Sequence, residues 1–330
     1  MRVALDALGG DHGPAPNLQG AASALRGLPD LTVVAVGEPG TLEPHLASAE
    51  LDADRFEVVP CVGSVGMDEK PTVALREKPE CSLAVMWKLL AEKQVDAVVS
   101  AGNTGAVVAA GLRTRQFLKP VKRPGIAVPL PTSAGRSVLM DCGANPHAKP
   151  EHLFQYGVIG AVYAREILGI ERPRIGTLNI GSEEGKGNEL VGETHELFKS
   201  AGSLPGEYVG YVEGRGIYHG EADVTVCEGF VGNVVLKVSE GFAQYLLRAV
   251  GEGLVGAGVL GPEDAMKTVG GVGRRFAYQA TGGAPLLGVD GACLIAHGSS
   301  DGDAIANAIK AAAEMVSKDV NGQIVAALGG

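Results

Sequence analysis

The chain has 330 residues and a formal net charge of −10 at pH 7, because 28 Lys and Arg residues stand against 38 Asp and Glu residues. Its length suggests about two domains or one large α/β unit with two lobes, and its acidic balance disfavours a non-specific nucleic-acid binder. No apolar run approaches membrane-spanning length, and the five scattered cysteines, which lack zinc-type spacing, predict reduced thiols, no metal site and a cytoplasmic location.

The first expected strand, Arg2–Asp6, runs directly into a glycine-rich turn. A strand this close to residue 1 predicts that no signal peptide precedes the fold. A helix is expected to start at Pro14 or Pro16 and to reach about Arg26. Polar residues at the carboxyl end of a strand are where open α/β sheets bind ligands, although Asp and Gly also make ordinary tight turns. The binding candidates in this turn are Asp6, Gly10, Asp11 and His12.

Two more strands, Leu31–Gly37 and Phe56–Pro60, are expected before a long polar loop from Gly63 to Glu80. A loop of that length is uncommon unless it is functional or mobile, and its cations would be able to close over an anionic substrate. These cations are Lys70, Arg76 and Lys78. A solvated loop is the alternative interpretation. A helix with an apolar stripe is expected to follow from Ser82 to Lys93.

A second strand followed by a turn of small residues is expected at Val95–Ser100. The turn reads SAGNTGA and leads into an apolar helix, so free backbone N–H groups and the helix dipole favour an anion there. Glycine lets a ligand approach the backbone closely, and the polar side chains add hydrogen-bond donors. The candidates in this turn are Ser100, Gly102, Asn103, Thr104 and Gly105.

One basic region lies in this acidic chain between Arg113 and Lys149, where Asp141 is the sole acid. Local basic charge favours docking of an acidic partner, and a solvated surface is the alternative. Within the region, Gly125–Pro131 and Arg136–Cys142 are expected to form a hairpin between the lobes. The second strand ends in another polar turn, DCGAN, which contains the candidate Asn145. The cations nearest the start of the region are Arg113, Arg115, Lys119, Lys122 and Arg123.

The stretch RIGTLNIGSEEGKGN follows an expected helix at Pro150–Leu168 and combines a strand at Ile175–Ile180 with a glycine-rich turn and a helix at Glu189–Phe198. Such a turn is a potential anion site, and Lys186 adds a mobile cation. It is one residue short of a P-loop and lacks the Ser or Thr that holds magnesium, which favours phosphate or oxyanion chemistry over nucleotide hydrolysis. An ordinary strand-to-helix connection is the alternative. The candidates are Asn179, Gly181, Glu184, Lys186 and Asn188.

Strands at Tyr208–Val212 and Val224–Cys227 are expected next, and the second enters a helix through EGFVGN, which contains the candidate Asn233. From Gly241 to Tyr278 the chain has a broad apolar face that glycines and a proline interrupt, with cations nearby. Broken amphipathic helices of this kind lie on anionic membrane surfaces, and core or dimer packing is the alternative. Two GxGxxG matches here follow a helix instead of a strand, so we do not interpret them as dinucleotide sites.

A last strand at Ala292–Ala296 precedes His297 and the final helix. Polar strand ends thus recur along the chain, at Asp6, Ser100, Asp141, Asn179, Cys227 and Ala296. Because the carboxyl ends of parallel strands meet at one edge of a sheet, a cleft at that edge is the expected active site. The alternation of strands and helices predicts an α/β fold with a mainly parallel sheet.

Several motifs, in order between Arg2 and Met315, carry a resemblance to a known family. They read ALDALGGDHGP, SAGNTGA, DCGAN, LNIGSEEGKGN, CEGFVGN, GGAPLLG and AHGSSD. By these motifs the chain resembles the bacterial phosphate acyltransferases of phospholipid synthesis, which convert acyl-acyl-carrier protein and inorganic phosphate into acyl phosphate. Two positions depart from the family's pattern: Glu228 replaces the usual Asp, and Cys81 replaces the usual Ser.

The resemblance implies a two-lobed fold like that of isocitrate and isopropylmalate dehydrogenases and of phosphotransacetylase. Residues 1–330 would form one catalytic unit, with a second lobe over roughly 125–280. It also implies a homodimer, an active site in the interlobe cleft, and neither metal nor nicotinamide cofactor. The amphipathic segment 248–275 corresponds to the family's membrane contact, which places the enzyme at the inner face of the cell membrane. There its product would feed a glycerol-3-phosphate acyltransferase.

Phosphate is already an anionic nucleophile and a thioester has a good leaving group, so the implied reaction chiefly requires positioning and stabilisation of a tetrahedral oxyanion. Phosphate is expected at the turn Ala101–Gly105. Direct attack predicts that no covalent acyl-enzyme forms. The expected catalytic residues are Lys186 as a cation for phosphate, Asn179 or Asn188 as a donor to the oxyanion, and His12 or His297 as the acid for the leaving thiolate.

The acidic carrier protein is expected to dock on the cations between Arg113 and Arg123 and to deliver its acyl chain to an apolar channel. Alternatives come from other classes of protein. A phosphotransacetylase that acts on short acyl-coenzyme A would share the fold and the anion site. A decarboxylating dehydrogenase would require magnesium and a nicotinamide, and a membrane scaffold would bind lipid without releasing a thiol.

Overall fold

Eleven strands form one sheet in the part of the chain that the computed structural model describes, residues 1–276 and 282–329. They are β1 Arg2–Asp6, β2 Thr32–Gly37, β3 Phe56–Pro60, β4 Ala97–Ser100, β5 Gly125–Thr132, β6 Gly135–Met140, β7 Arg174–Asn179, β8 Glu207–Glu213, β9 Val224–Val226, β10 Ala284–Leu287 and β11 Ala292–Ile295. Their order is β3-β2-β1-β4-β11-β10-β5-β6-β9-β7-β8. The pairs β11–β10, β10–β5 and β5–β6 are antiparallel, and the others are parallel.

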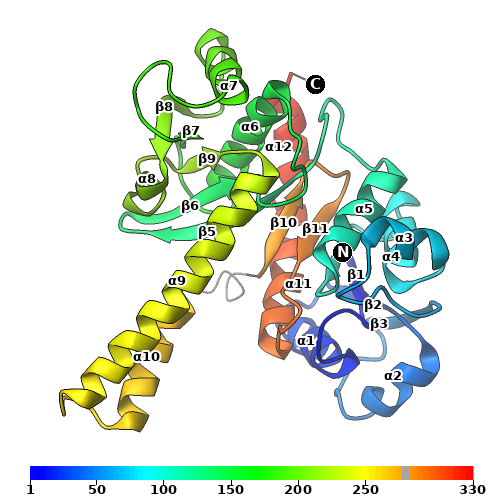
Figure 1. Ribbon diagram of the computed structural model, residues 1–330. Coiled ribbons are helices and arrows are strands. Elements are labelled where there is room, and N and C mark those ends of the chain that lie inside the picture. Colours follow the sequence, from blue (N-terminus) through cyan, green and yellow to red (C-terminus); the bar gives the residue numbers. More distant parts are fainter. Residues whose placement is uncertain (277–281, 330) are drawn as a thin grey trace.

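The strand order divides the sheet into two groups of strands on either side of β10, which supports the predicted two-lobed α/β architecture. One group contains β1 to β4 with β11, and the other contains β5 to β9 (Figure 1). β10 joins them, because Leu286 pairs with Ile126 of β5 while Pro285 pairs with Leu294 of β11. The predicted hairpin is confirmed by the antiparallel register of β5 and β6. The end of the expected second lobe, at residue 280, lies outside the described residues.

Helices cover both faces of the sheet. They are α1 Pro14–Gly27, α2 Pro39–Leu46, α3 Pro71–Glu77, α4 Ser82–Ala91, α5 Thr104–Thr114, α6 Pro150–Glu166, α7 Glu189–Ser200, α8 Gly214–His219, α9 Gly229–Gly256, α10 Pro262–Phe276, α11 Gly302–Ser317 and α12 Val320–Ala327. Because both faces are covered, central strands such as β4 are continuous apolar runs without an alternating polar face.

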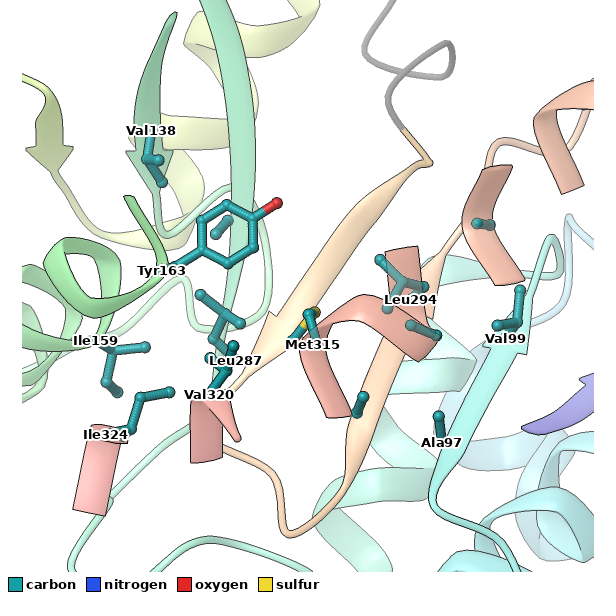
Figure 2. Packing of buried hydrophobic residues seen from close by; sticks show 14 of the residues in the cluster. Ala97, Val99, Val138, Ile159, Tyr163, Leu287, Leu294, Met315, Val320 and Ile324 are labelled. Atoms are coloured by element: carbon teal, nitrogen blue, oxygen red, sulfur yellow. The ribbon is translucent and has the colours of Figure 1, made fainter. Parts of the chain in front are cut away.

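The core has two layers, one on each side of the sheet. Leu287 of β10 and Leu294 of β11 pack with Met315 of α11 on one side (Figure 2). Leu286 of β10 packs on the other side, in the layer that contains Trp87 of α4. Successive residues of a strand face opposite sides, so the short β10 contributes to both layers.

The structure corrects two expectations and adds one strand that the sequence analysis does not predict. The stretch Gly63–Glu80 is not a continuous loop, because Pro71 begins the short helix α3. The motif Gly282–Gly288 contains a strand, β10. Local propensity does not predict this strand, because glycine and proline are uncommon in strands. The apolar segment after Gly241 is not a set of broken helices at its start, because α9 continues through it to Gly256.

Helices α9 and α10 form an antiparallel arm that projects from the body of the molecule (Figure 1). Glycines lie at their contact: a side chain at Gly251 would meet Val269, and one at Gly273 would meet Leu247, each at 3.3 Å. These glycines therefore allow the two helices to pack closely. The end of the expected segment at Tyr278 lies outside the described residues, as do the side chains of Arg274 and Arg275.

Candidate active site

A cavity of about 420 Å³ opens at the strand edge where the sequence predicts a cleft. Its walls come from β5, the ends of β6 and β11, the start of α5 and the first turns of α9. Its polar lining residues are Asp11, Thr104, Asn233, Lys237 and His297, and its apolar lining includes Met67, Ile126, Val128, Leu236 and Ile295. The cavity thus contains polar groups for a charged ligand and apolar side chains for a carbon chain.

Five of the predicted site residues meet in this cavity, although they come from four separate segments. They are Asp11, Thr104, Gly105, Asn233 and His297. The turn after β1 is held against the loop after β11 because the Asp11 backbone N–H donates to the Gly298 carbonyl at 2.7 Å. Asn233 and Lys237 are four residues apart on α9, so they share one face of that helix.

The start of α5, where the sequence predicts an anion site, borders the cavity. Gly105 lines the cavity at the second position of this 11-residue helix. A side chain at Gly105 would come within 2.9 Å of Pro71 in α3, so glycine is required by the close approach of the two helices. The first N–H groups of a helix lack partners within it, and the helix dipole favours negative charge at that end.

Asn103 has a structural role in place of the predicted contact with substrate. Its side-chain oxygen accepts a hydrogen bond from Ala106 N at 3.1 Å and thereby caps α5. Its side-chain N–H₂ donates to the carbonyl groups of Gly66, Met67 and Glu69. Asn103 therefore fixes the loop that brings Met67 to the cavity.

Asp6 and Ser100 also lie beneath the site, because both are almost completely buried. The Ser100 hydroxyl donates to Asp6 Oδ2 at 2.7 Å and accepts from Gly102 N at 3.0 Å. Burial raises the pKa of the Asp6 carboxyl, and the hydrogen bonds it accepts partly oppose that rise. We expected these residues to contact the substrate directly; the structure instead has them support the turns after β1 and β4.

Asp141 organises the turn at the end of β6. Its carboxylate accepts hydrogen bonds from four backbone N–H groups, those of Ile126, Gly143, Ala144 and Asn145, at 2.7–3.1 Å. The Asn145 side chain also donates to it, at 3.2 Å, and to the Pro124 carbonyl at 2.6 Å. Asn145 is thus a support of this turn, although the sequence suggested a binding role. The turn places Gly143 in the cavity wall beside Asn233.

The glycine-rich turn after β7 is held by hydrogen bonds of its own asparagines. Asn179 donates to the Lys186 carbonyl at 3.1 Å and accepts from Ile180 N at 2.9 Å. Asn188 caps α7 by accepting from Val191 N at 3.0 Å. Glu184 is exposed and lies 3.8 Å from Lys199. The structure therefore brings these predicted residues together with Gly181, but none of them lines the cavity.

Of the two histidines proposed as acids, only His297 lines the cavity, whereas His12 is exposed on the turn after β1. Two cysteines near the site are poor nucleophiles. Burial raises the pKa of the Cys142 and Cys227 thiols well above its ordinary value, and the thiolate is the reactive form. This environment favours direct attack on a substrate over a covalent acyl-cysteine.

Lys237 is the charged cavity residue that sequence reasoning did not select. Its Nζ lies 2.9 Å from Glu240 Oε2, and its side chain remains about half exposed. The available signal was its position four residues after Asn233, on the same helical face. Of the residues that the structure describes, no group of three or more His, Cys, Asp or Glu side chains has the arrangement of a metal site.

The expected docking cations also reach the surface. Arg113, Arg115, Lys119, Lys122 and Arg123 are all exposed. Arg113 donates to the Leu75 carbonyl at 2.7 Å. None of the five forms an ion pair with another described residue. Their positive charge is therefore not neutralised by a salt bridge within this part of the chain.

Comparison with solved structures identifies the fold. The alignment with EutD phosphotransacetylase from Staphylococcus aureus covers 96% of this chain and 94% of that chain. Its TM-score is 0.60 and the sequence identity is 14%. A phosphotransacetylase from Streptococcus pyogenes gives a TM-score of 0.63 over 97% of this chain and 94% of that chain, also at 14% identity. Isocitrate dehydrogenase from Methylococcus capsulatus gives a TM-score of 0.51 at 11% identity, over 97% of this chain and 87% of that chain. The predicted fold class is confirmed.

Comparison with protein sequences identifies the family. The family model described as "Fatty acid synthesis protein" matches residues 1–323. A "Phosphate acyltransferase" of Desulfitobacterium hafniense is 45% identical over 96% of this chain and 94% of its own length. A protein of the same name from Syntrophotalea carbinolica is 43% identical over 99% of this chain and 94% of its own length. The chain therefore belongs to the fatty acid synthesis protein family, whose members include these phosphate acyltransferases.

Proposed function

We propose that the chain transfers an acyl group from acyl-acyl-carrier protein to inorganic phosphate in the cavity between β5, α5 and α9. The observation that carries this proposal is a cavity whose lining combines a lysine with several apolar side chains. Lys237, Asn233 and the start of α5 suit a phosphate dianion. Ile126, Val128 and neighbouring apolar residues suit the first part of an acyl chain. The names of the family's curated members support the same activity.

In this reaction a phosphate oxygen attacks the thioester carbonyl carbon. The C–S bond breaks in the following step, and the sulfur leaves with the electron pair as a thiolate. Holding the two reactants together removes much of the entropic barrier, and donors aimed at the carbonyl oxygen stabilise the tetrahedral intermediate. No group on the enzyme needs to form a covalent bond.

The test measures thiol release from purified acyl-acyl-carrier protein with and without inorganic phosphate. We expect release only with phosphate, and acyl phosphate as the product. Short acyl-coenzyme A serves as the second substrate in parallel. Turnover of acyl-coenzyme A without turnover of the carrier-protein substrate would establish the phosphotransacetylase alternative instead. Release from neither substrate would refute both.

The exposed cations from Arg113 to Arg123 fit an acidic carrier protein. Reversing two of them, with Lys122→Glu and Arg123→Glu, is expected to raise KM for acyl-acyl-carrier protein about tenfold at low salt, because steering by complementary charge is lost. The kcat is expected to change little. Steady-state kinetics at low and high salt provide the measurement.

The matched control for charge reversal is Lys88→Glu with Arg172→Glu, two exposed cations on other elements. An equal rise in KM for this control would show that net charge alone is responsible. An unchanged KM in the Lys122 and Arg123 variant would contradict docking at this surface.

The arm carries several large apolar side chains on its surface. Val238, Phe242, Tyr245, Val259 and Met266 are between 61% and 78% exposed. No helix among the described residues is long and apolar enough to span a bilayer. We propose that the tip of the arm lies on the membrane surface and that the face of α9 nearer the body pairs with a second copy in a homodimer. Attachment to the inner face of the cell membrane would deliver acyl phosphate to a glycerol-3-phosphate acyltransferase.

Placing a charge at the tip, with Val259→Glu and Met266→Glu, is expected to abolish most co-sedimentation with anionic phospholipid vesicles, because burial of a carboxylate in the interface is costly. Thiol release in solution is expected to persist. Val62→Glu is the matched control, since Val62 is 63% exposed on a different surface. Equal loss of vesicle binding in both proteins would contradict a contact at the tip.

A further inference from the structure

His297 follows β11 and lines the cavity. Its Nδ1 atom faces Ser299 in the next loop. His297 Nδ1 lies 3.2 Å from the backbone nitrogen of Ser299 and 2.8 Å from the Ser299 hydroxyl oxygen. Both contacts involve Nδ1, so Nε2 has no hydrogen-bond partner among the described residues and remains available to a molecule in the cavity.

The backbone N–H of Ser299, which donates to His297 Nδ1 at 3.2 Å, favours one position for the proton on the neutral ring. A backbone N–H group is only a donor, so the Nδ1 atom that it points to must supply a lone pair. In a neutral imidazole, one nitrogen accepts and the other carries the proton. The proton of neutral His297 therefore lies on Nε2, the nitrogen that is left for the cavity.

We propose that His297 is a neutral hydrogen-bond donor to the thioester carbonyl oxygen and that Ser299 is the positioning residue that selects its Nε2–H tautomer. This assignment rests on the proposed acyl transfer and replaces the sequence-based idea of His297 as an acid. As phosphate attacks, the carbonyl oxygen gains negative charge and its hydrogen bond to Nε2–H strengthens. No proton leaves the ring.

The remaining steps of the reaction do not require His297 to donate a proton. A phosphate oxygen forms the new C–O bond, and the electron pair of the C–S bond leaves with sulfur. The resulting thiolate takes its proton from solvent, which is feasible because thiols have a pKa of about 8.5. After this step His297 is unchanged and ready to bind the next substrate.

Three substitutions at this position separate donation from proton transfer. The Gln side chain can place an N–H near the Nε2 position, whereas that of Asn reaches only the Nδ1 position. We expect His297→Ala and His297→Asn to lower kcat by about 10²–10³-fold, the usual loss for one oxyanion donor. His297→Gln is expected to keep kcat within about tenfold of the parent protein, since it retains the donor. His45→Ala, at a half-buried site on α2 that does not line the cavity, is the control and is expected to retain full activity.

Equal loss in the Gln and Ala variants, or no loss in the Ala variant, would overturn the proposal. A second measurement does not depend on any variant: ¹⁵N chemical shifts of the His297 ring in the intact protein at pH 8 report its tautomer directly. We expect the Nε2–H pattern, and an Nδ1–H pattern would refute the assignment. If the parent protein released no thiol at all, the proposed acyl transfer would fail, whereas the ¹⁵N measurement would still decide the tautomer.

Discussion

Replacing Asp141 by alanine is expected to prevent stable folding of the chain. The substitution would leave four backbone N–H groups and the Asn145 amide without the carboxylate that they share. Three of these hydrogen bonds are buried and two are part-buried. Each buried donor left unpaired costs about 1–3 kcal/mol, so the loss is comparable with the total stability of about 5–15 kcal/mol that is typical of folded proteins. Soluble yield and urea unfolding provide the measurement.

The control for this variant is Asp54→Ala, because Asp54 is exposed and its side chain makes no hydrogen bond among the described residues. We expect the free energy of unfolding of Asp54→Ala to stay within about 0.5 kcal/mol of the parent value, as for ordinary surface substitutions. An Asp141→Ala protein that unfolds at the parent urea concentration would show that the turn after β6 is satisfied by water instead.

Replacing Lys237 by alanine is expected to lower kcat/KM for phosphate about 10- to 100-fold, the effect of losing a charged hydrogen bond of about 1.5–3 kcal/mol. The loss should appear in the dependence on phosphate concentration, because Lys237 is a cation in the cavity lining. Lys237→Arg keeps the charge and is expected to recover part of the activity. Kinetics at varied phosphate and saturating acyl-acyl-carrier protein provide the measurement.

Lys186→Ala is the informative comparison for Lys237→Ala. The sequence predicts that Lys186 binds phosphate, whereas the structure places it on the turn after β7, outside the cavity lining. A loss confined to Lys237→Ala would assign the phosphate to α9. A comparable loss in Lys186→Ala would instead require the β7 turn to act at a cavity other than the one in its own chain.

Sequence reasoning predicted the edge of the sheet where the cavity opens, since the carboxyl ends of parallel strands lie together in any α/β fold. It selected Thr104, Asn233 and His297, which line that cavity, for the same reason. It assigned direct contact to Asp6 and Asn145 as well, which the structure places in supporting roles. Adjacent residues at a strand end can face substrate or core, and their residue type does not decide between these directions.

The missed elements have a common physical cause. β10 lies in a Gly- and Pro-rich motif, and α3 lies in a polar stretch, so both are stabilised by tertiary contacts that local propensity does not report. Lys237 was overlooked because it lies one helical turn beyond a motif, where a lysine ordinarily faces solvent. Only the packing of α9 beside β5 and β6 reveals that this face borders a cavity.

The position of β10 and β11 at the centre of the sheet has a consequence for biosynthesis. These strands are made late, after the arm, yet they join the edge of β4 to the edge of β5. At a typical rate of about 5–20 residues per second, the ribosome needs several seconds to proceed from β9 to β11. During that interval the strand edges of both halves and the apolar arm are exposed together. A nascent chain of this protein is therefore expected to depend on chaperones chiefly while this segment is being synthesised.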